Sequence, residues 1–182
     1  MTKNIEVEVR GLLKKEEYIS LMNFLDKNAN SKTLDDRQTT FFIIPNKTLK
    51  ITRNLLTNKA KISLKIGDIS TNFAQEEIEL DIDSNDFETA IEIFKNLGFT
   101  KLQNTTQKRT NYNYKDTDFA IKWSKDWGYH FELELMVATE DQIITAHTKL
   151  LQTAKELKLT VMTAQEMSDF CKRVDTEHNS NN

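Results

Sequence analysis

The sequence of 182 residues contains one cysteine, one proline and four glycines. The single cysteine, Cys171, excludes an intramolecular disulfide and a zinc site built from several thiolates. It lies at helical spacing from Met167 and Val174, so we expect a core thiol. No apolar run approaches a membrane span, and the polar, acidic start lacks the basic and apolar regions of a signal peptide. We therefore predict a cytoplasmic protein that makes no membrane contact.

Excess charge of either sign is also lacking. The formal net charge is -3 and the isoelectric point is near 5.7, so nothing attracts the whole chain to nucleic acid, and an anion site requires a local concentration of Lys and Arg. With 38% hydrophobic and 29% charged residues, the chain suits one domain with its own core. We expect this domain to span residues 1–175, followed by a frayed tail over 176–182.

The main pattern that is present is an alternation of charged and apolar residues at period two, which is typical of strands. In the first such segment Glu6, Glu8 and Arg10 share one face, and three aliphatic residues lie on the other. The pattern recurs in segments 59–66 (Lys61, Lys65), 75–83 (Glu77, Glu79) and 129–137 (Glu132, Glu134), and more weakly in 49–53 (Lys50) and 119–124 (Lys122). Such strands form either an exposed sheet with cross-strand ion pairs or a closed barrel with a polar lumen. Periodicity does not separate the two.

Apolar stripes at helical spacing and capping residues predict helices over about 14–28, 84–97, 140–158 and 164–175. The fold class is therefore α+β. The helices must cover the apolar faces of the strands, so the charged rows point away from them. If the sheet closes, these rows line a tunnel for a charged ligand.

The segment from Glu6 to Arg10 resembles the Glu-x-Glu-x-Lys signature of the CYTH domain, or triphosphate tunnel metalloenzyme family, with arginine in place of lysine. Further segments resemble the family's motifs in the right order, and they are Thr40 to Asn46 (Thr-Tyr-Phe-Asp-Thr-Pro-Asp or Asn), Leu49 to Thr52 (Leu-Arg-Ile-Arg), Ile62 to Lys65 (Leu-Thr-Leu-Lys), Gln75 to Glu79 (Arg-x-Glu-x-Glu), Arg109 to Tyr112 (Arg-x-x-Tyr) and Gly128 to Glu134 (Gly-x-Phe-x-Glu-x-Glu). Each motif is weak alone, but their order over residues 4–137 is a specific signal.

The resemblance implies a closed eight-stranded antiparallel β-barrel with helices packed outside, whose lumen binds a triphosphate with Mg²⁺ or Mn²⁺. It places Glu6, Glu8, Glu132 and Glu134 as metal ligands, with Glu77 and Glu79 as possible additional lumen acids. The phosphate contacts would be Arg10, Lys50, Arg53, Lys61, Lys65, Arg109 and Lys122, and the catalytic residues Glu8 and Lys65. Carboxylate oxygens suit hard divalent cations, and Lys and Arg suit successive phosphoryl groups.

Four residues depart from the family's motifs. Lys122 stands where a lumen aspartate is usual, Thr52 and Gln75 replace arginines, and Ile43 replaces an aspartate. Arg53 and Lys61 could restore positive charge, and Asp126 negative charge, if bulges bring them inward. The departures imply altered substrate choice, one metal instead of two, or lost catalysis.

We therefore expect a hydrolase that cleaves inorganic, nucleoside or thiamine triphosphate with metal-activated water. One alternative is a class IV adenylate cyclase, in which the ribose 3'-hydroxyl replaces water, and another is a module that binds triphosphates without turnover. The expected partner is the small-molecule triphosphate, with no nucleic acid, and the chain is expected to be a monomer or a homodimer.

Overall fold

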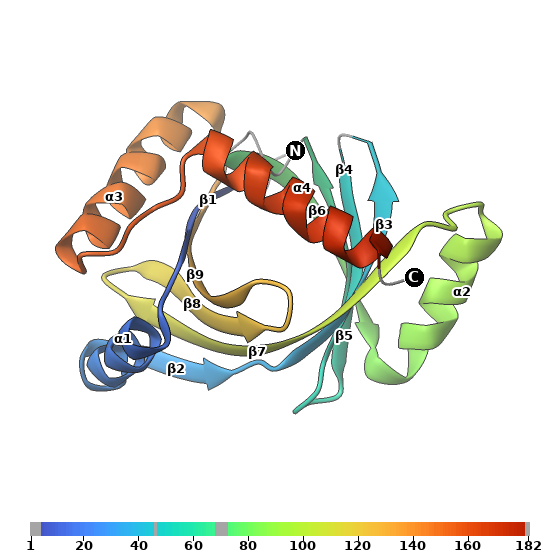
Figure 1. Cartoon of the computed structure of the whole chain (residues 1–182), viewed down its shortest axis with the longest axis horizontal. Coiled ribbons are helices and arrows are strands. Elements are labelled where there is room, and N and C mark those ends of the chain that lie inside the picture. The colour runs from blue at the N-terminus through green and yellow to red at the C-terminus, as the bar shows by residue number, and fades with distance from the viewer. Residues whose placement is uncertain (1–4, 46, 68–72, 181–182) are drawn as a thin grey trace.

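The fold is an antiparallel β-barrel with helices on its outside (Figure 1). The computed structural model describes residues 5–45, 47–67 and 73–180. Asn4, where the resemblance begins, Asn46 of the second motif, and residues 181–182 of the expected tail lie outside the described residues. The α+β class and the closed barrel predicted from the family resemblance are confirmed.

Eight strands pair in the order β7-β3-β4-β5-β6-β1-β9-β8, and β8 pairs back onto β7 to close the barrel. The strands are β1 (Ile5–Leu12), β2 (Ser31–Leu34), β3 (Arg37–Ile44), β4 (Lys47–Asn54), β5 (Lys59–Ile66), β6 (Ala74–Asp83), β7 (Leu102–Tyr114), β8 (Thr117–Ser124) and β9 (Gly128–Val137). The ninth strand, β2, pairs with β7 beyond the end of β3. Closure leaves no free sheet edge between β7 and β8, where Arg109 pairs with Lys122.

The helices are α1 (Lys15–Asn28), α2 (Phe87–Asn96), α3 (Ile143–Glu156) and α4 (Ala164–Ser180), with 3₁₀ turns at Ser84–Asp86 and Glu140–Gln142. Figure 1 shows α2 on one side of the barrel and α1 and α3 on the other. No helix among the described residues has the length and apolar character needed to cross a bilayer. α4 extends five residues past the predicted end of the last helix, into the expected tail.

Two apolar cores fill the space between the helices and the outer face of the barrel. One joins α1 and α3 to the outward side chains of β1, β7, β8 and β9, including Val7, Ile121 and Leu133. The other joins α2 to β3 and β4 through Phe42 and Phe87. Each fully buried aliphatic or aromatic side chain stabilises the fold by about 1.5 to 3 kcal/mol. Since the outward side chains make the cores, the inward ones are left for the lumen.

α4 begins beside β1 and runs across one end of the barrel toward β3 (Figure 1). The segment that leads into α4 lies close to β1. The Met162 N–H donates to the Arg10 carbonyl at 2.8 Å, and a side chain at Gly11 would meet the Thr160 carbonyl at 2.2 Å. A capping box precedes α4, since Thr163 Oγ1 accepts from the Glu166 N–H and Glu166 accepts from the Thr163 N–H. Glycine is thus required where the connection to α4 passes the barrel.

Candidate active site

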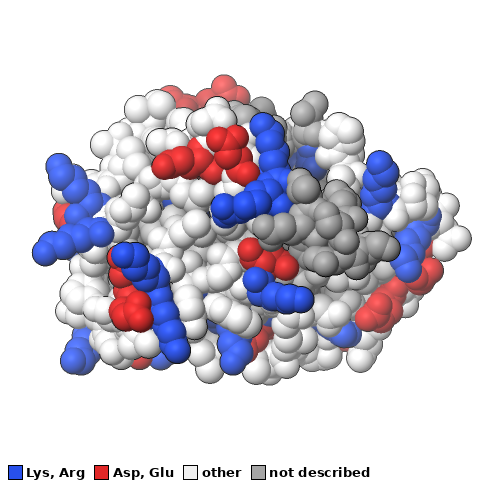
Figure 2. Space-filling view, viewed as in Figure 1, with Lys and Arg blue, Asp and Glu red and all other residues white. Residues whose placement is uncertain are grey.

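The inward side chains of the barrel line a cavity of about 370 Å³. Period two sends Glu6 and Arg10 of β1, Lys65 of β5 and Lys122 of β8 into it. On the described part of the face drawn in Figure 2, acidic and basic side chains are interspersed with wide uncharged areas. The cavity lining itself has the local concentration of Lys and Arg that the sequence analysis required for an anion site.

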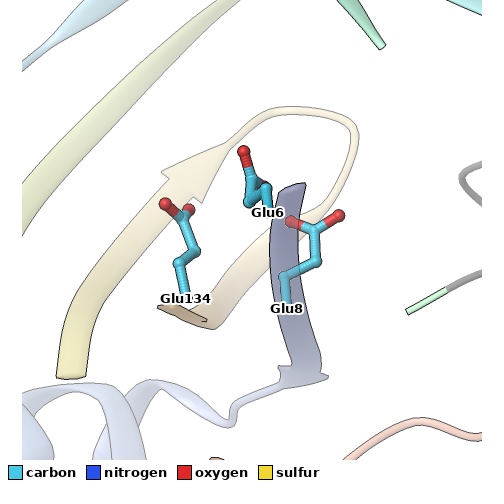
Figure 3. A group of neighbouring side chains, drawn as sticks. All are labelled: Glu6, Glu8 and Glu134. Atoms are coloured by element: carbon cyan, nitrogen blue, oxygen red, sulfur yellow. The ribbon is translucent and has the colours of Figure 1, made fainter. Parts of the chain in front are cut away.

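Three carboxylates gather in the lumen (Figure 3). One oxygen each of Glu6, Glu8 and Glu134 lies within 4.8 Å of the other two. β1 supplies two of these residues at period two, and β9 places Glu134 directly opposite Glu8 in the register. Glu8 Oε2 is buried and has no hydrogen-bond partner among the described residues. A buried carboxylate oxygen without a partner is costly, so the cluster has an open place for a positive ligand.

Cations border this cluster closely. Lys65 Nζ donates to Glu6 Oε1 at 2.6 Å and lies 3.7 Å from Glu8 Oε1, while the Arg10 guanidinium donates to the same Glu8 oxygen. Burial alone would lower the pKa of Lys65, but Glu8 and Glu6 raise it above the usual value. Burial raises the pKa of Glu6, and its hydrogen bond with Glu77 adds to that rise. A cation bound beside Glu6 would oppose this rise.

The fourth predicted metal ligand, Glu132, is not in the three-carboxylate group. It is bound by three cations, with Arg10 Nε at 3.1 Å, Arg109 Nη1 at 3.7 Å and the Lys122 ammonium in direct contact. Lys122 is therefore in the lumen, and burial followed by the nearby Arg109 lowers its pKa well below the usual value. On Glu134, burial acts to raise the pKa, but Arg109 and Lys122 lower it strongly. Glu132 is thus paired with three cations, whereas Glu134, which Arg109 contacts at 3.4 Å, belongs to the three-carboxylate group.

The remaining predicted lumen residues on β4, β5 and β6 form cross-lumen or neighbouring pairs. Lys50 Nζ lies 3.9 Å from Glu77 Oε1, and Lys61 pairs with Glu79, which also accepts from Ser63 at 2.9 Å. Burial, and then the positive charge of Lys65, lower the pKa of Lys50 to about 8. These pairs lie in or at the rim of the lumen, next to the acidic cluster through Glu77.

The prediction for Arg53 is wrong. Its guanidinium lies on the outer face of β4, where it donates to Gln38 Oε1, contacts Glu88 at 3.7 Å and lies over the Phe87 ring at 4.6 Å. No bulge interrupts the pairing of β4 with its neighbours, so period two keeps Thr52 inside and Arg53 outside. Thr52 shares a 3.0 Å hydroxyl contact with Thr39 in place of a guanidinium. Arg53 therefore stabilises α2 against the barrel.

Sequence reasoning missed several lumen residues. Arg37 lines the cavity and is held by Asp35, and the period-two row that it shares with Thr39 could have identified it. His130 is buried in the lumen, where burial and then Lys122 lower its pKa to about 3, so its imidazole is neutral near pH 7. Cys171 is half-buried and lines the cavity, so the expected core thiol is wrong. A strand pattern contains no information about a residue delivered by a distant helix.

Divalent cations of the Mg²⁺ and Mn²⁺ type fit the three-carboxylate group. The donors are all carboxylate oxygens, the ligands that hard cations prefer, and Glu8 Oε2 has no hydrogen-bond partner among residues 5–45, 47–67 and 73–180. Glu6, Glu8 and Glu134 would hold such an ion, while Glu132 is committed to its three cations.

The sequence matches the CYTH domain family over residues 4–164. The chain belongs to the CYTH domain family. Solved structures share the CYTH fold, among them a conserved hypothetical protein from Pyrococcus furiosus at 24% identity, covering 86% of this chain and 94% of that one with a TM-score of 0.69. No curated protein sequence matches the chain.

Two further structural neighbours of this CYTH domain carry functional descriptions. A Hippeastrum protein, described as a candidate adenylyl cyclase with a dominant triphosphatase activity, is 14% identical and covers 87% of this chain and 89% of that one at a TM-score of 0.57. The Mimivirus capping enzyme triphosphatase is 12% identical, with 86% and 90% covered and a TM-score of 0.53. At these identities the likeness shows the fold alone.

Proposed function

We propose that this CYTH domain hydrolyses a triphosphate in its lumen with the help of Mg²⁺ or Mn²⁺. The single observation that carries the proposal is the open group of Glu6, Glu8 and Glu134 directly beside buried Lys and Arg side chains. Carboxylates that accept a divalent cation and cations that accept phosphate oxygens are the two requirements of phosphoryl transfer. The triphosphatase descriptions of two neighbours agree with this assignment.

Each lumen residue has a role in this proposal. Glu6, Glu8 and Glu134 hold the cation, which supplies charge neutralisation and an activated water when bound. Lys65 changes partner, because its ammonium donates to a phosphate oxygen once Glu6 and Glu8 serve as ligands. Arg10 and Arg109 orient the chain of phosphoryl groups with their planar guanidinium groups. Lys50 and Lys61 neutralise its far end.

The test is an assay of purified protein with Mg²⁺ or Mn²⁺ and a panel of triphosphates, in which phosphate, pyrophosphate and cyclic AMP are measured separately. Phosphate release supports the proposal. Cyclic AMP from ATP would identify a cyclase, and binding without any product would identify a binding module. A cytoplasmic location, the limits of the domain and a monomeric or homodimeric state stay predictions.

A triphosphate with Mg²⁺ should raise the melting temperature far more than inorganic phosphate at the same concentration, because only the longer ligand engages several lumen cations together. Lys65→Ala should remove most of this rise. Lys108→Ala is the matched control, since Lys108 lies on the exposed outer face of β7, next to Arg109 in sequence. Differential scanning fluorimetry gives the three shifts. Equal shifts for the two ligands, or equal effects of the two variants, would contradict a binding site in the lumen.

Triphosphate affinity should fall as pH rises through about 8. Lys50 is charged below its pKa of about 8 and neutral above it, and a neutral amine contributes little to phosphate binding. If binding requires the ammonium, affinity falls by up to about tenfold per pH unit above the pKa. Calorimetry between pH 7 and 9 with a non-hydrolysable analogue checks this. Lys50→Met should flatten the profile and Lys108→Met should not; parallel profiles for Lys50→Met and wild type would remove Lys50 from the site.

A further inference from the structure

Asp35 is a buried carboxylate that lies behind the lumen wall rather than among the residues that line the cavity. It belongs to the two-residue connection between β2 and β3. Arg37 Nε donates to its Oδ2 at 2.8 Å, with Nη2 also in contact, and Asn111 donates to the same oxygen at 2.9 Å. Asn54 donates to Oδ1 at 2.8 Å. Burial acts to raise the pKa of Asp35, but Arg37 and Asn111 hold it below its usual value, so the side chain is ionised near pH 7.

Arg37 begins β3 and carries its guanidinium into the cavity. The next inward pair of β3 and β4 is Thr39 with Thr52, whose hydroxyl oxygens lie 3.0 Å apart and carry no charge. Arg37 therefore brings positive charge to a part of this wall that otherwise has hydroxyl groups. Asp35 engages Nε and Nη2, which form one edge of the guanidinium. The other edge, Nη1 with Nη2, has the geometry to donate two hydrogen bonds to a phosphate group.

The same connection fixes Arg109 of β7. The Asp35 N–H donates to the Arg109 carbonyl at 2.9 Å, and the Arg109 N–H donates to Asp36 Oδ1 at 3.0 Å. The Arg109 Nε donates to Asn111 Oδ1 at 2.5 Å and lies 3.7 Å from Asp35 Oδ2. Both the backbone and the side chain of Arg109 are thus tied to this connection, while Nη1 and Nη2 face the lumen carboxylates.

One oxygen, Asp35 Oδ2, therefore lies between two guanidinium groups. Without its negative charge, Arg37 and Arg109 would repel each other and lose the partner that fixes their directions. Arg109 also contacts Glu134 at 3.4 Å, but Glu134 is one of the three carboxylates suited to a divalent cation. Where Glu134 serves as a metal ligand, Asp35 and Asn111 still hold the Arg109 Nε. A guanidinium that is already held in place loses less conformational entropy when it binds phosphate.

We propose that Asp35 is a positioning residue that orients Arg37 and Arg109 for triphosphate binding, and that Arg37 itself donates to a phosphate oxygen. This rests on the proposed function, because it adds two residues to the same lumen site. Asp35 is negative, and a carboxylate near an anion site weakens anion binding by repulsion. Removal of its charge would therefore tighten triphosphate binding if Asp35 had no positioning role. Positioning predicts the opposite sign, because Arg37 and Arg109 then lose their common partner.

The experiment measures the dissociation constants of hydrolysis-resistant imido analogues of tripolyphosphate and ATP by calorimetry with Mn²⁺. Asp35→Asn, which removes the charge at nearly constant shape, should weaken binding at least about tenfold, the loss expected for one charge-assisted hydrogen bond. Asp35→Glu keeps the charge and should retain more affinity than Asp35→Asn. Asp26→Asn is the matched control, because Asp26 also pairs with a cation and a hydroxyl, those of Lys32 and Tyr112, but lies outside the cavity lining. It should bind both analogues as wild type does.

Arg37→Met tests the phosphate contact by itself, because it leaves Asp35 and its two asparagine partners in place. It should also weaken binding at least about tenfold. In the double variant, Asp35→Asn should cost less affinity than it costs in wild type, since part of its effect passes through Arg37. A purely structural role for Asp35 would give the same cost in both backgrounds. The melting temperatures of the free variants show whether each remains folded.

Binding by Asp35→Asn that equals or exceeds wild type, unchanged binding by Arg37→Met, or an equal cost of Asp35→Asn in both backgrounds would overturn the inference. Phosphate release from hydrolysable triphosphates tests the proposed function separately. Wild type that binds the analogues and releases no phosphate would contradict the proposed function and leave these affinity ratios measurable. Hydrolysis by wild type, with binding by Asp35→Asn unaffected, would contradict the inference alone.

Discussion

Replacement of Glu8 by glutamine is expected to abolish metal-dependent turnover while the protein remains folded. Glu8 contributes an oxygen to the three-carboxylate group, and its Oε2 is buried without a hydrogen-bond partner in the part of the chain that the structure describes. An amide oxygen binds a hard cation more weakly than a carboxylate does, and the NH₂ group would face Arg10 and Lys65 with the wrong polarity. Loss of a metal ligand should cost at least about 100-fold in kcat/KM, since loss of groups that only support ligands already costs about 10- to 100-fold.

The measurement combines a phosphate-release assay with calorimetric titration of Mn²⁺. Glu8→Gln should lose both activity and metal binding, and its circular dichroism spectrum should match wild type. Glu92→Gln provides the control, because Glu92 is an exposed α2 residue whose carboxylate pairs with Lys95 at the surface. Full turnover of wild type in excess chelator, or full metal binding by Glu8→Gln, would rule out the assigned role.

The sequence predicts the lumen well where charged and apolar residues alternate. β1, β5 and β9 alternate strictly, because one face must enter an apolar core and the other must not, and their inward residues Glu6, Lys65 and Glu134 lie in the lumen. Closure of the barrel, in contrast, does not follow from the alternation of residues. It depends on the pairing of β7 with β8, and after Leu102 the first half of β7 has polar residues on both faces, so no pattern in the strand reveals its partner. Only the resemblance to a family of known fold predicted closure.

Sequence patterns also do not predict which charged side chains form ion pairs within the lumen. Glu132 and Glu134 are equivalent in the alternation of β9, yet Glu132 is surrounded by three cations and Glu134 belongs to the three-carboxylate group. The difference arises from which strands face each residue across the lumen. The same holds for α4, whose apolar stripe predicts a helix that packs on something but does not say that it covers the end of the barrel.

Lys122 is expected to limit the lumen to one divalent cation. Its ammonium contacts Glu132, which Arg10 and Arg109 also approach, so this carboxylate is neutralised before any metal arrives. Lys122→Asp removes one of these cations and places a second carboxylate beside Glu132. Two neighbouring carboxylates offer the oxygen ligands that a hard cation requires, and phosphate oxygens can complete its coordination. Calorimetry with Mn²⁺ and a non-hydrolysable triphosphate analogue should then give one ion per chain for wild type and two for Lys122→Asp.

Lys122→Met separates the two effects of this substitution. Methionine removes the ammonium without adding a carboxylate, so Lys122→Met should keep a stoichiometry of one and bind the triphosphate analogue more weakly, as a lost phosphate contact requires. If catalysis is limited by a missing ion, turnover rises in Lys122→Asp and falls in Lys122→Met. Two ions bound by wild type would show that the contact between Lys122 and Glu132 opens on ligand binding. One ion in all three proteins would mean that Arg10 and Arg109 are sufficient to neutralise Glu132. Lys122 would then contribute to substrate binding without determining the number of bound metal ions.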